Sequence, residues 1–149
     1  MTNWLSDEEM GAWRAFIETH ADLISAIESD LVPTGLTLGD YQVLVYLTEA
    51  AEQSMRMCDL ADMLQLSPSG LTRRLDGLVA AGWVERRNSA TDRRVMLAAL
   101  TDEGRQRLAD AAPTHVASVR NRMIDVLDAD DHRAVARAFT KIRTALDVE

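Results

Sequence analysis

Apolar residues in the first 31 positions repeat at the spacing of a helix. The stripe consists of Met10, Trp13, Ile17, His20, Ile24, Ile27 and Leu31, at alternating steps of three and four. Such a period predicts one long helix with an apolar face. Ser6 and Glu9 form a capping-box pattern, so we expect the helix to begin there. The stripe offers more apolar surface than one neighbour in a small domain covers. We therefore expect pairing with a second copy of the chain, with packing inside the subunit as the alternative.

The central part of the chain predicts a helix-turn-helix. A helix at about 38–50 is apolar on most sides and should be central. Two further helices are expected at 57–64 and 68–81, joined by a three-residue turn. Ser67 followed by a proline is typical of a helix start, and Gly82 marks the end of the second helix. Two helices joined so tightly form a helix-turn-helix.

Beyond residue 82 the period changes from helical to extended. The segments "WVERR" and "RVMLAAL" are rich in strand-forming residues, and the polar stretch "NSATD" separates them. This pattern predicts a β-hairpin. A helix should restart at Thr101, with Pro113 interrupting and bending it, and a last helix should be capped by Asp128 or Asp130.

The expected fold class is mainly α (α+β). It is a winged helix-turn-helix with a two-stranded wing, flanked by long N- and C-terminal dimerisation helices. The divisions we expect are 1–35 for the N-terminal dimerisation helix, 36–100 for the winged-helix lobe and 101–149 for the C-terminal dimerisation helices.

Charge is distributed unevenly along this acidic chain. The formal net charge is −8, and residues 1–53 hold one arginine against ten acidic residues. Residues 54–100 reverse the sign, with seven arginines against five acidic residues. Because a polyanion binds only where the local potential is positive, this basic segment indicates a nucleic-acid partner. A solvated charged face is the alternative interpretation of the arginine pairs taken alone.

The phase of the helix 68–81 indicates which side chains would meet DNA. At about 100° per residue, Leu71, Leu75 and Leu78 share one face and Arg73 lies opposite. A major groove admits one helix, and an arginine can pair with guanine there, so Arg73 is the first candidate for base readout. The DNA-binding set that we predict comprises Ser67, Ser69, Gly70, Thr72, Arg73 and Arg74 from the helix and Arg86, Arg87, Asp92, Arg93 and Arg94 from the hairpin.

The run "DRRVMLAALTDEG", residues 92–104, resembles the D-x-R and L-T-x-x-G signature of the MarR family of transcriptional regulators. The stretch "LADMLQLSPSGLTRRLDGLVAAGWVERR" is similar to the helix-turn-helix and first wing strand of that family, and the flanking helices fit too. The resemblance implies a homodimer that binds palindromic double-stranded DNA, with Arg94 in the minor groove and Asp92 fixing it. It also implies release by small anionic or aromatic ligands. Ala98 departs from the aliphatic residue usual in the family.

Two further features remain open in the sequence. An effector pocket would use Trp13, Phe16, His20, Tyr41 and Tyr46, although each also suits ordinary packing. The single cysteine, Cys58, suggests a redox sensor or plain packing. The peroxide-sensing branch of the resembled family carries its thiol in the first helix, whereas this cysteine starts the helix before the turn.

Several classes of protein lack support in the sequence. One cysteine forms no intrachain disulfide and no cysteine-based zinc cluster. The chain has no G-x-G-x-x-G, no phosphate-binding loop ending in Gly-Lys and no H-E-x-x-H motif. We therefore expect no catalysis, no cofactor and no metal. No signal peptide or membrane span is evident, so we expect a cytoplasmic repressor. A winged helix used only for protein contacts is the alternative.

Overall fold

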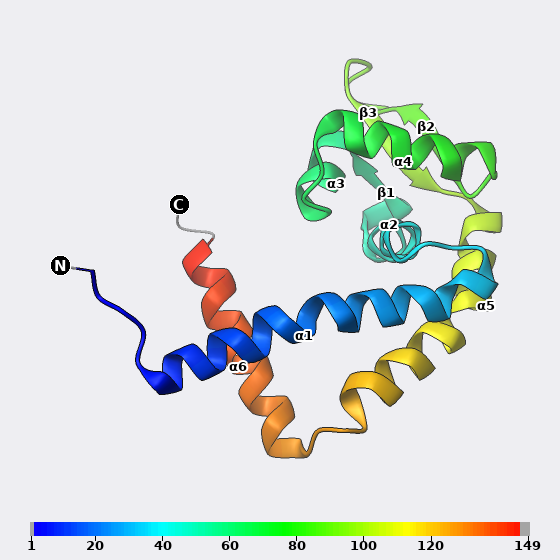
Figure 1. Ribbon diagram of the computed structural model, residues 1–149. Coiled ribbons are helices and arrows are strands. Elements are labelled where there is room, and N and C mark those ends of the chain that lie inside the picture. The colour runs from blue at the N-terminus through cyan, green and yellow to red at the C-terminus, as the bar shows by residue number, and fades with distance from the viewer. Residues whose placement is uncertain (1, 147–149) are drawn as a thin grey trace. The chain divides into compact units, whose positions relative to one another are not determined.

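The computed structural model describes residues 2–146 and is mostly helical, with one small antiparallel sheet (Figure 1). The elements in order are α1 (Asp7–Leu31), η1 (Val32–Thr34), α2 (Leu38–Glu49), η2 (Ala51–Gln53), β1 (Ser54–Arg56), α3 (Met57–Met63), α4 (Pro68–Ala80), β2 (Val84–Asn88), β3 (Met96–Leu100), α5 (Asp102–Val119), η3 (Arg120–Ile124) and α6 (Ala129–Leu146). The predicted helices and the predicted hairpin are confirmed.

The described chain forms two compact units. The first unit contains residues 2–27 and 115–146, and the second contains residues 28–114. The second unit, here called the lobe, therefore includes the end of α1 and the first part of α5 in addition to the predicted winged-helix segment. None of the helices within residues 2–146 has the length and apolar character that crossing a bilayer requires.

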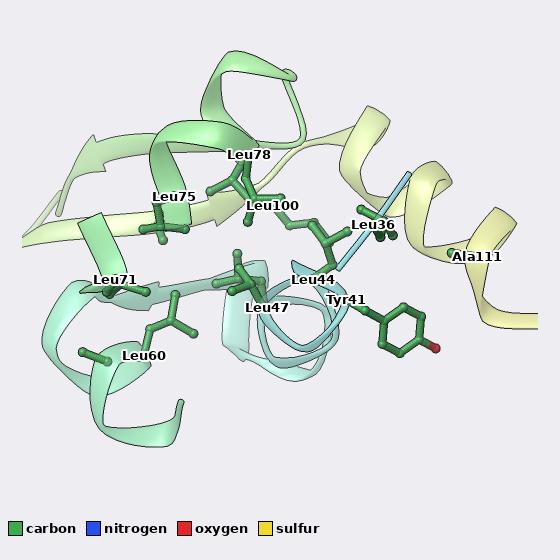
Figure 2. Close-up of a cluster of buried hydrophobic side chains, with 14 of the residues drawn as sticks. Leu36, Tyr41, Leu44, Leu47, Leu60, Leu71, Leu75, Leu78, Leu100 and Ala111 are labelled. Carbon is green, nitrogen blue, oxygen red and sulfur yellow. The ribbon is translucent and has the colours of Figure 1, made fainter. Parts of the chain in front are cut away.

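The apolar face of α4 closes the core of the lobe. Leu71, Leu75 and Leu78 are each at most 2% exposed, as the helical phase predicts. They pack with Leu44, Leu47 and Leu60 from α2 and α3 (Figure 2). Burying a leucine side chain contributes about 1.5–3 kcal/mol, so this face holds α4 firmly against the rest of the lobe.

Both ends of α4 match the sequence signals. Ser67 is the N-cap residue, and its Oγ accepts a hydrogen bond from the backbone N–H of Gly70 at 3.1 Å. Pro68 occupies the first helical turn, where it removes no helical hydrogen bond. Gly82, just past the helix, has a φ of +77°, a conformation that favours glycine.

The sheet contains one strand more than the sequence predicts. β2 and β3 form the expected hairpin, with Val84 opposite Leu100. β1 adds a third strand on the other side of β3, giving the order β1-β3-β2. β3 begins at Met96, two residues later than the predicted return strand "RVMLAAL". Arg93 and Arg94 therefore lie in the wing loop, before the strand.

The L-T-x-x-G segment joins the hairpin to α5. Thr101 Oγ1 donates to the Gly82 carbonyl oxygen at 2.7 Å and accepts from the Gly104 N–H at 3.0 Å. The second bond caps the start of α5. Gly104 is buried, and a Cβ at this position would overlap the backbone carbonyl oxygen of Trp83. Only a glycine allows α5 to approach the α4–β2 corner this closely.

The helices of the other unit follow the predicted caps. Ser6 and Glu9 form the reciprocal bonds of a capping box at α1. Asp128 caps α6, because its Oδ1 accepts from the N–H groups of Asp130 and Asp131 at 2.8 and 2.9 Å. These bonds satisfy backbone donors that the first turn of each helix would otherwise leave unpaired.

The prediction that Pro113 interrupts the fifth helix is wrong. α5 runs through Pro113 to Val119, and the irregular segment is the π-helical turn η3 that follows. Pro113 removes the helical donor for the carbonyl of Ala109, but both residues are exposed. Water can therefore satisfy that carbonyl, and the helix continues.

The substitution Gly104→Ala tests the joint between α5 and the hairpin. We expect a loss of roughly 3 kcal/mol in the free energy of unfolding, the upper end of the usual range for overpacked sites, because the added methyl meets backbone. Urea unfolding measures the loss. Gly11→Ala is the matched control, since nothing lies within 4 Å of a Cβ at Gly11. Equal stability of Gly104→Ala and the unsubstituted protein would contradict the account.

Candidate nucleic-acid interface

The side of α4 opposite the core exposes the residue predicted for base readout. Arg73 is exposed, and within residues 2–146 its guanidinium group forms no hydrogen bond or ion pair. Ser69 and Thr72 are exposed on the same helix. Thr72 Oγ1 donates to the carbonyl oxygen of Pro68 at 2.9 Å, and Ser69 Oγ lies 3.2 Å from Ser67 Oγ. The outward side of α4 therefore carries one available cation and short hydroxyl groups.

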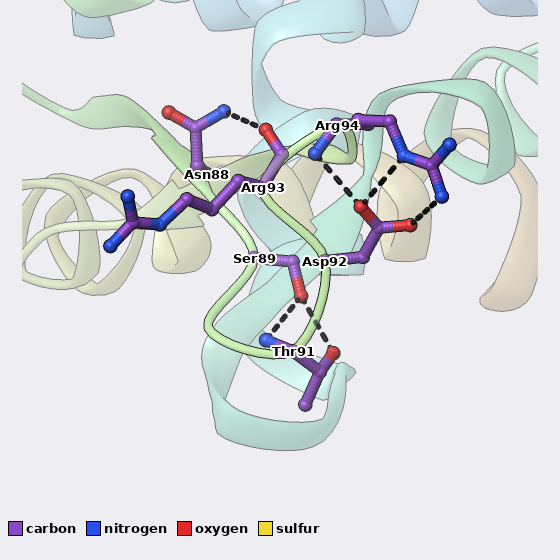
Figure 3. Close-up of polar contacts among 6 residues, drawn as sticks. All are labelled: Asn88, Ser89, Thr91, Asp92, Arg93 and Arg94. Atoms are coloured by element: carbon purple, nitrogen blue, oxygen red, sulfur yellow. Dashed lines mark hydrogen bonds and ion pairs between the residues drawn. The ribbon is translucent and has the colours of Figure 1, made fainter.

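Hydrogen bonds within the wing loop give it a defined shape (Figure 3). Asn88 Nδ2 donates to the carbonyl oxygen of Arg93 at 2.7 Å. The Ser89 N–H donates to the Val95 carbonyl oxygen at 2.9 Å, and Ser89 Oγ accepts from the Thr91 N–H at 3.3 Å. The side chains of Arg93 and Arg94 are presented from this loop and are both exposed.

Asp92 holds Arg94 in one orientation, as the sequence interpretation expected. Asp92 Oδ1 accepts from the backbone N–H of Arg94 at 3.0 Å and from its Nε at 3.3 Å. The Arg94 side chain nevertheless remains 91% exposed. An exposed ion pair contributes little to stability, so its effect is to fix the direction of the guanidinium group.

The same bonds act on the protonation of Asp92. Hydrogen bonds from the backbone and then the side chain of Arg94, with a smaller contribution from the charge of Arg56, lower the pKa of Asp92 below its usual 3.8. The charged carboxylate is therefore favoured in the folded state. The contact is fully present at neutral pH and is lost only as the pH falls through this lowered pKa.

Arg86, predicted as a DNA contact, connects the wing to α4. Its Nη2 donates to the carbonyl oxygen of Thr72 at 3.0 Å and to Asp76 Oδ1 at 2.8 Å. These bonds fix β2 next to the middle of α4. One of the two acceptors, Thr72, directly precedes Arg73 in the sequence. Arg87 on the same strand is exposed, and its Nη1 lies 3.8 Å from Glu85 Oε1.

Arg74, also in the predicted set, contacts another helix of the lobe. Its Nη1 donates to Thr37 Oγ1 at 3.1 Å and to Asp40 Oδ1 at 3.2 Å. Both partners lie at the start of α2, about 35 residues away in sequence. Because each partner is distant along the chain, the helical phase of α4 gives no signal for this contact.

Arg56 is a basic residue near the wing that the sequence prediction omitted. It ends β1, opposite Leu97 of β3, and its charge influences the pKa of Asp92. The omission follows from the missed strand, since a three-residue strand carries too little alternation to be recognised. Arg56 is exposed and adds positive charge near Asp92 of the wing loop.

The candidate effector residues belong to different units: Trp13, Phe16 and His20 to the first unit, and Tyr41 and Tyr46 to the lobe. Phe16 stacks on His20 with ring centroids 5.1 Å apart and lies 6.2 Å from Trp13. Phe139 of α6, outside the predicted set, joins them at 5.6 Å from Phe16. Trp13, Phe16 and Phe139 are each 40–52% exposed, so this aromatic cluster is not a closed core.

The two tyrosines of that set belong to the lobe. Tyr41 is buried in the core of the lobe, and burial raises its pKa above the usual 10. Tyr46 packs against the same core and is partly buried. Both side chains therefore have a packing role within α2.

Cys58 lies in the first turn of α3 and is exposed. Its thiol donates to Asp59 Oδ1 at 3.3 Å. A neighbouring carboxylate does not stabilise a thiolate, which is the reactive form of cysteine. The redox role of this residue stays a prediction.

Comparisons with known proteins relate the chain to one family. A model of the MarR family matches residues 34–95. The crystal structure of AbsC, a MarR family transcriptional regulator from Streptomyces coelicolor, is 39% identical, with a TM-score of 0.92 over 99% of this chain and 100% of that one. Sco3205, a MarR family regulator from the same organism solved in complex with DNA, is 31% identical, with a TM-score of 0.90 over 97% of this chain and 92% of that one.

A more distant structure carries a small molecule. CouR from Rhodococcus jostii RHA1, bound to p-coumaroyl-CoA, is 29% identical, with a TM-score of 0.75 over 95% of each chain. The chain spans about half the length of the curated repressors that it matches, 42–51%. The named curated relatives are transcriptional repressors, and AbsC and Sco3205 are MarR family transcriptional regulators. Because the fold matches over the whole length of AbsC and the family model matches the winged lobe, the chain belongs to the MarR family of transcriptional regulators.

Proposed function

We propose that the protein is a sequence-specific DNA-binding transcriptional regulator that represses by occupying its promoter. The observation that supports this most strongly is the exposure of Arg73 on α4 together with Arg94 on a wing loop that Asp92 orients. Sco3205, similar over nearly its whole length, was solved in complex with DNA. The curated relatives include repressors from Bacillus subtilis and Escherichia coli.

In the proposed complex, α4 enters the major groove with its outward side. Arg73 pairs with a guanine edge, and Ser69 and Thr72 make shorter contacts. Ser67 and Gly70, at the start of α4, lie against the DNA backbone. The N–H groups of the first helical turn favour a phosphate group there. Gly70 carries no side chain that would keep the helix away from the duplex.

The wing supplies the second contact. Arg94 enters the minor groove, whose negative potential favours an arginine. Asp92 prevents it from adopting other directions, which reduces the entropy lost on binding. Arg87 and Arg93, both exposed, add positive charge next to the sugar-phosphate backbone.

We also propose that the protein acts as a homodimer. Helices α1 and α6 carry large apolar side chains that are exposed. Among them are Trp13, Ile24, Phe139 and Ile142, whose exposed fractions are 46–53%. Exposed apolar surface of this extent in a folded protein indicates a partner surface. A two-fold dimer would present two α4 helices to a palindromic site.

An effector is the remaining part of the proposal. The exposed aromatic cluster of Trp13, Phe16 and His20 offers stacking surfaces for a small aromatic or anionic ligand, and CouR was solved with p-coumaroyl-CoA bound. Such a ligand would release the cytoplasmic regulator from DNA. The alternative is redox regulation through Cys58. If the Cys58→Ser variant still released DNA on oxidation as the unsubstituted protein does, this alternative would be excluded.

Removal of Arg94 tests the DNA-binding function itself. In a mobility-shift titration against duplexes flanking the protein's own gene, we expect the unsubstituted protein to retard DNA at low salt. Arg94→Ala should weaken binding by about 1–3 kcal/mol, the range for a good arginine contact. Arg14→Ala, an exposed arginine on α1, is the control. A winged helix used only for protein contacts would retard no duplex, and unchanged affinity of Arg94→Ala would refute the role of the wing.

Arg73→Ala should relax base preference at one position in each half-site. A guanidinium group that pairs with a base edge discriminates by about 1–3 kcal/mol at that base pair, and its loss should leave the other positions unaffected. Selection from a randomised duplex library measures the preference at every position. A uniform loss of affinity for all sequences would instead assign Arg73 to a phosphate contact.

Ile142→Asp should separate the proposed dimer. A charge on the exposed apolar side of α6 must be desolvated at an interface, so sedimentation equilibrium should give twice the 16.5 kDa chain mass for the unsubstituted protein and one chain mass for the variant. Arg137→Asp places the same charge on the other side of α6 and should remain dimeric. A single-chain mass for the unsubstituted protein would overturn the homodimer proposal.

A further inference from the structure

The contact between Arg74 and the start of α2 is built into both elements. Arg74 Nη1 donates to Thr37 Oγ1 and Asp40 Oδ1, at 3.1 and 3.2 Å. The side chains of Arg74 and Asp40 are only 31% and 22% exposed. The guanidinium group therefore lies against the protein and is not extended into solvent as Arg94 is.

The two acceptors of Arg74 are themselves fixed by backbone. Thr37 and Asp40 form the capping box of α2, in which Thr37 Oγ1 accepts from the Asp40 N–H at 3.1 Å and Asp40 Oδ2 accepts from the Thr37 N–H at 3.1 Å. Arg74 uses the remaining capacity of the same two side chains. Because neither acceptor can rotate without breaking the cap of α2, this contact relates the backbone of α2 to that of α4.

Gly39 provides the space for this contact. A Cβ at Gly39 would overlap Nη1, Cζ and Nη2 of Arg74. The residue lies in the first turn of α2, where most amino acids are otherwise acceptable and its own conformation does not require glycine. The absence of a side chain at this position therefore matters for the guanidinium group and not for the helix.

We propose that Arg74 is a positioning residue for DNA recognition: it fixes the direction of α4 relative to α2, and so the place of Arg73, without contacting DNA. The inference rests on the proposed function, in which α4 enters the major groove. Base readout requires side chains held to within about 0.5 Å, and the apolar packing of Leu71, Leu75 and Leu78 is not directional. The hydrogen bonds of Arg74 supply the missing direction.

The competing role for Arg74 is a phosphate contact. That role would require the guanidinium group to leave Thr37 and Asp40. Asp40 would then remain at the start of α2 as a carboxylate without a cationic partner, beside a polyanion, which opposes binding. The paired arrangement avoids this repulsion, because Arg74 neutralises Asp40.

The double variant Asp40→Asn/Arg74→Gln separates the two roles. It removes one positive and one negative charge, so the net charge of the lobe is unchanged. The probes are a duplex selected by the unsubstituted protein from a random library and a scrambled duplex of the same composition. The readouts are the ratio of the two affinities and the slope of log affinity against log salt concentration.

We expect the preference of the double variant for the selected duplex to fall about tenfold, because one displaced arginine contact loses discrimination of that size. The slope of log affinity against log salt concentration should equal that of the unsubstituted protein. A slope reduced by about 1, with the preference unchanged, would show a phosphate contact and overturn the proposal. An unaltered preference and slope would also overturn it.

Gly39→Ala provides a second test that keeps every charge. Its methyl group should displace the guanidinium group and reduce the preference similarly, with no reduction in slope. Gly11→Ala, where nothing lies within 4 Å of the added methyl, should bind as the unsubstituted protein does. If the unsubstituted protein binds neither duplex, the proposed function fails. If it binds selectively and both variants match it, only the role of Arg74 fails.

Discussion

Burial of one face of α4 is the constraint on which the rest of the lobe depends. Leu71, Leu75 and Leu78 fill the core against α2 and α3, and a helix has a fixed period. Once that face is buried, the opposite side must be exposed, and it carries Arg73. The placement of a cation on the outside of an acidic protein therefore follows from the hydrophobic effect acting on the other side of the same helix.

Apolar packing alone does not determine how α4 is directed, and polar contacts supply that information. Arg74 relates α4 to the cap of α2, and Arg86 relates it to β2 of the wing. Asp92 then directs Arg94 within the wing loop. Partly exposed ion pairs contribute about 0–1 kcal/mol each, so these contacts matter for geometry more than for stability.

The sequence was sufficient for features set by local spacing. The phase of α4, the capping box of Ser6 and Glu9 and the hairpin all follow from residues within about sixteen positions of one another, and all are confirmed. The third strand was missed because Ser54–Arg56 is too short to show alternation, and its pairing with β3 is distant in sequence. Pro113 was misjudged because tolerance of a helical proline depends on exposure, which a local pattern does not contain. The partners of Arg74 and Arg86 likewise come together only when separate segments meet. The sequence therefore placed both among the DNA contacts, Arg74 from its position on the helix and Arg86 from its position in the hairpin.

The most direct test of the central claim is NMR of the arginine Nε–Hε groups, with and without a duplex selected by the protein. Arg73 and Arg94 should both change in chemical shift, because both guanidinium groups enter the complex. Arg107, which lies over the ring of Trp83 within the lobe, should keep its signal. Unchanged signals of Arg73 and Arg94 in a saturated complex would contradict the account.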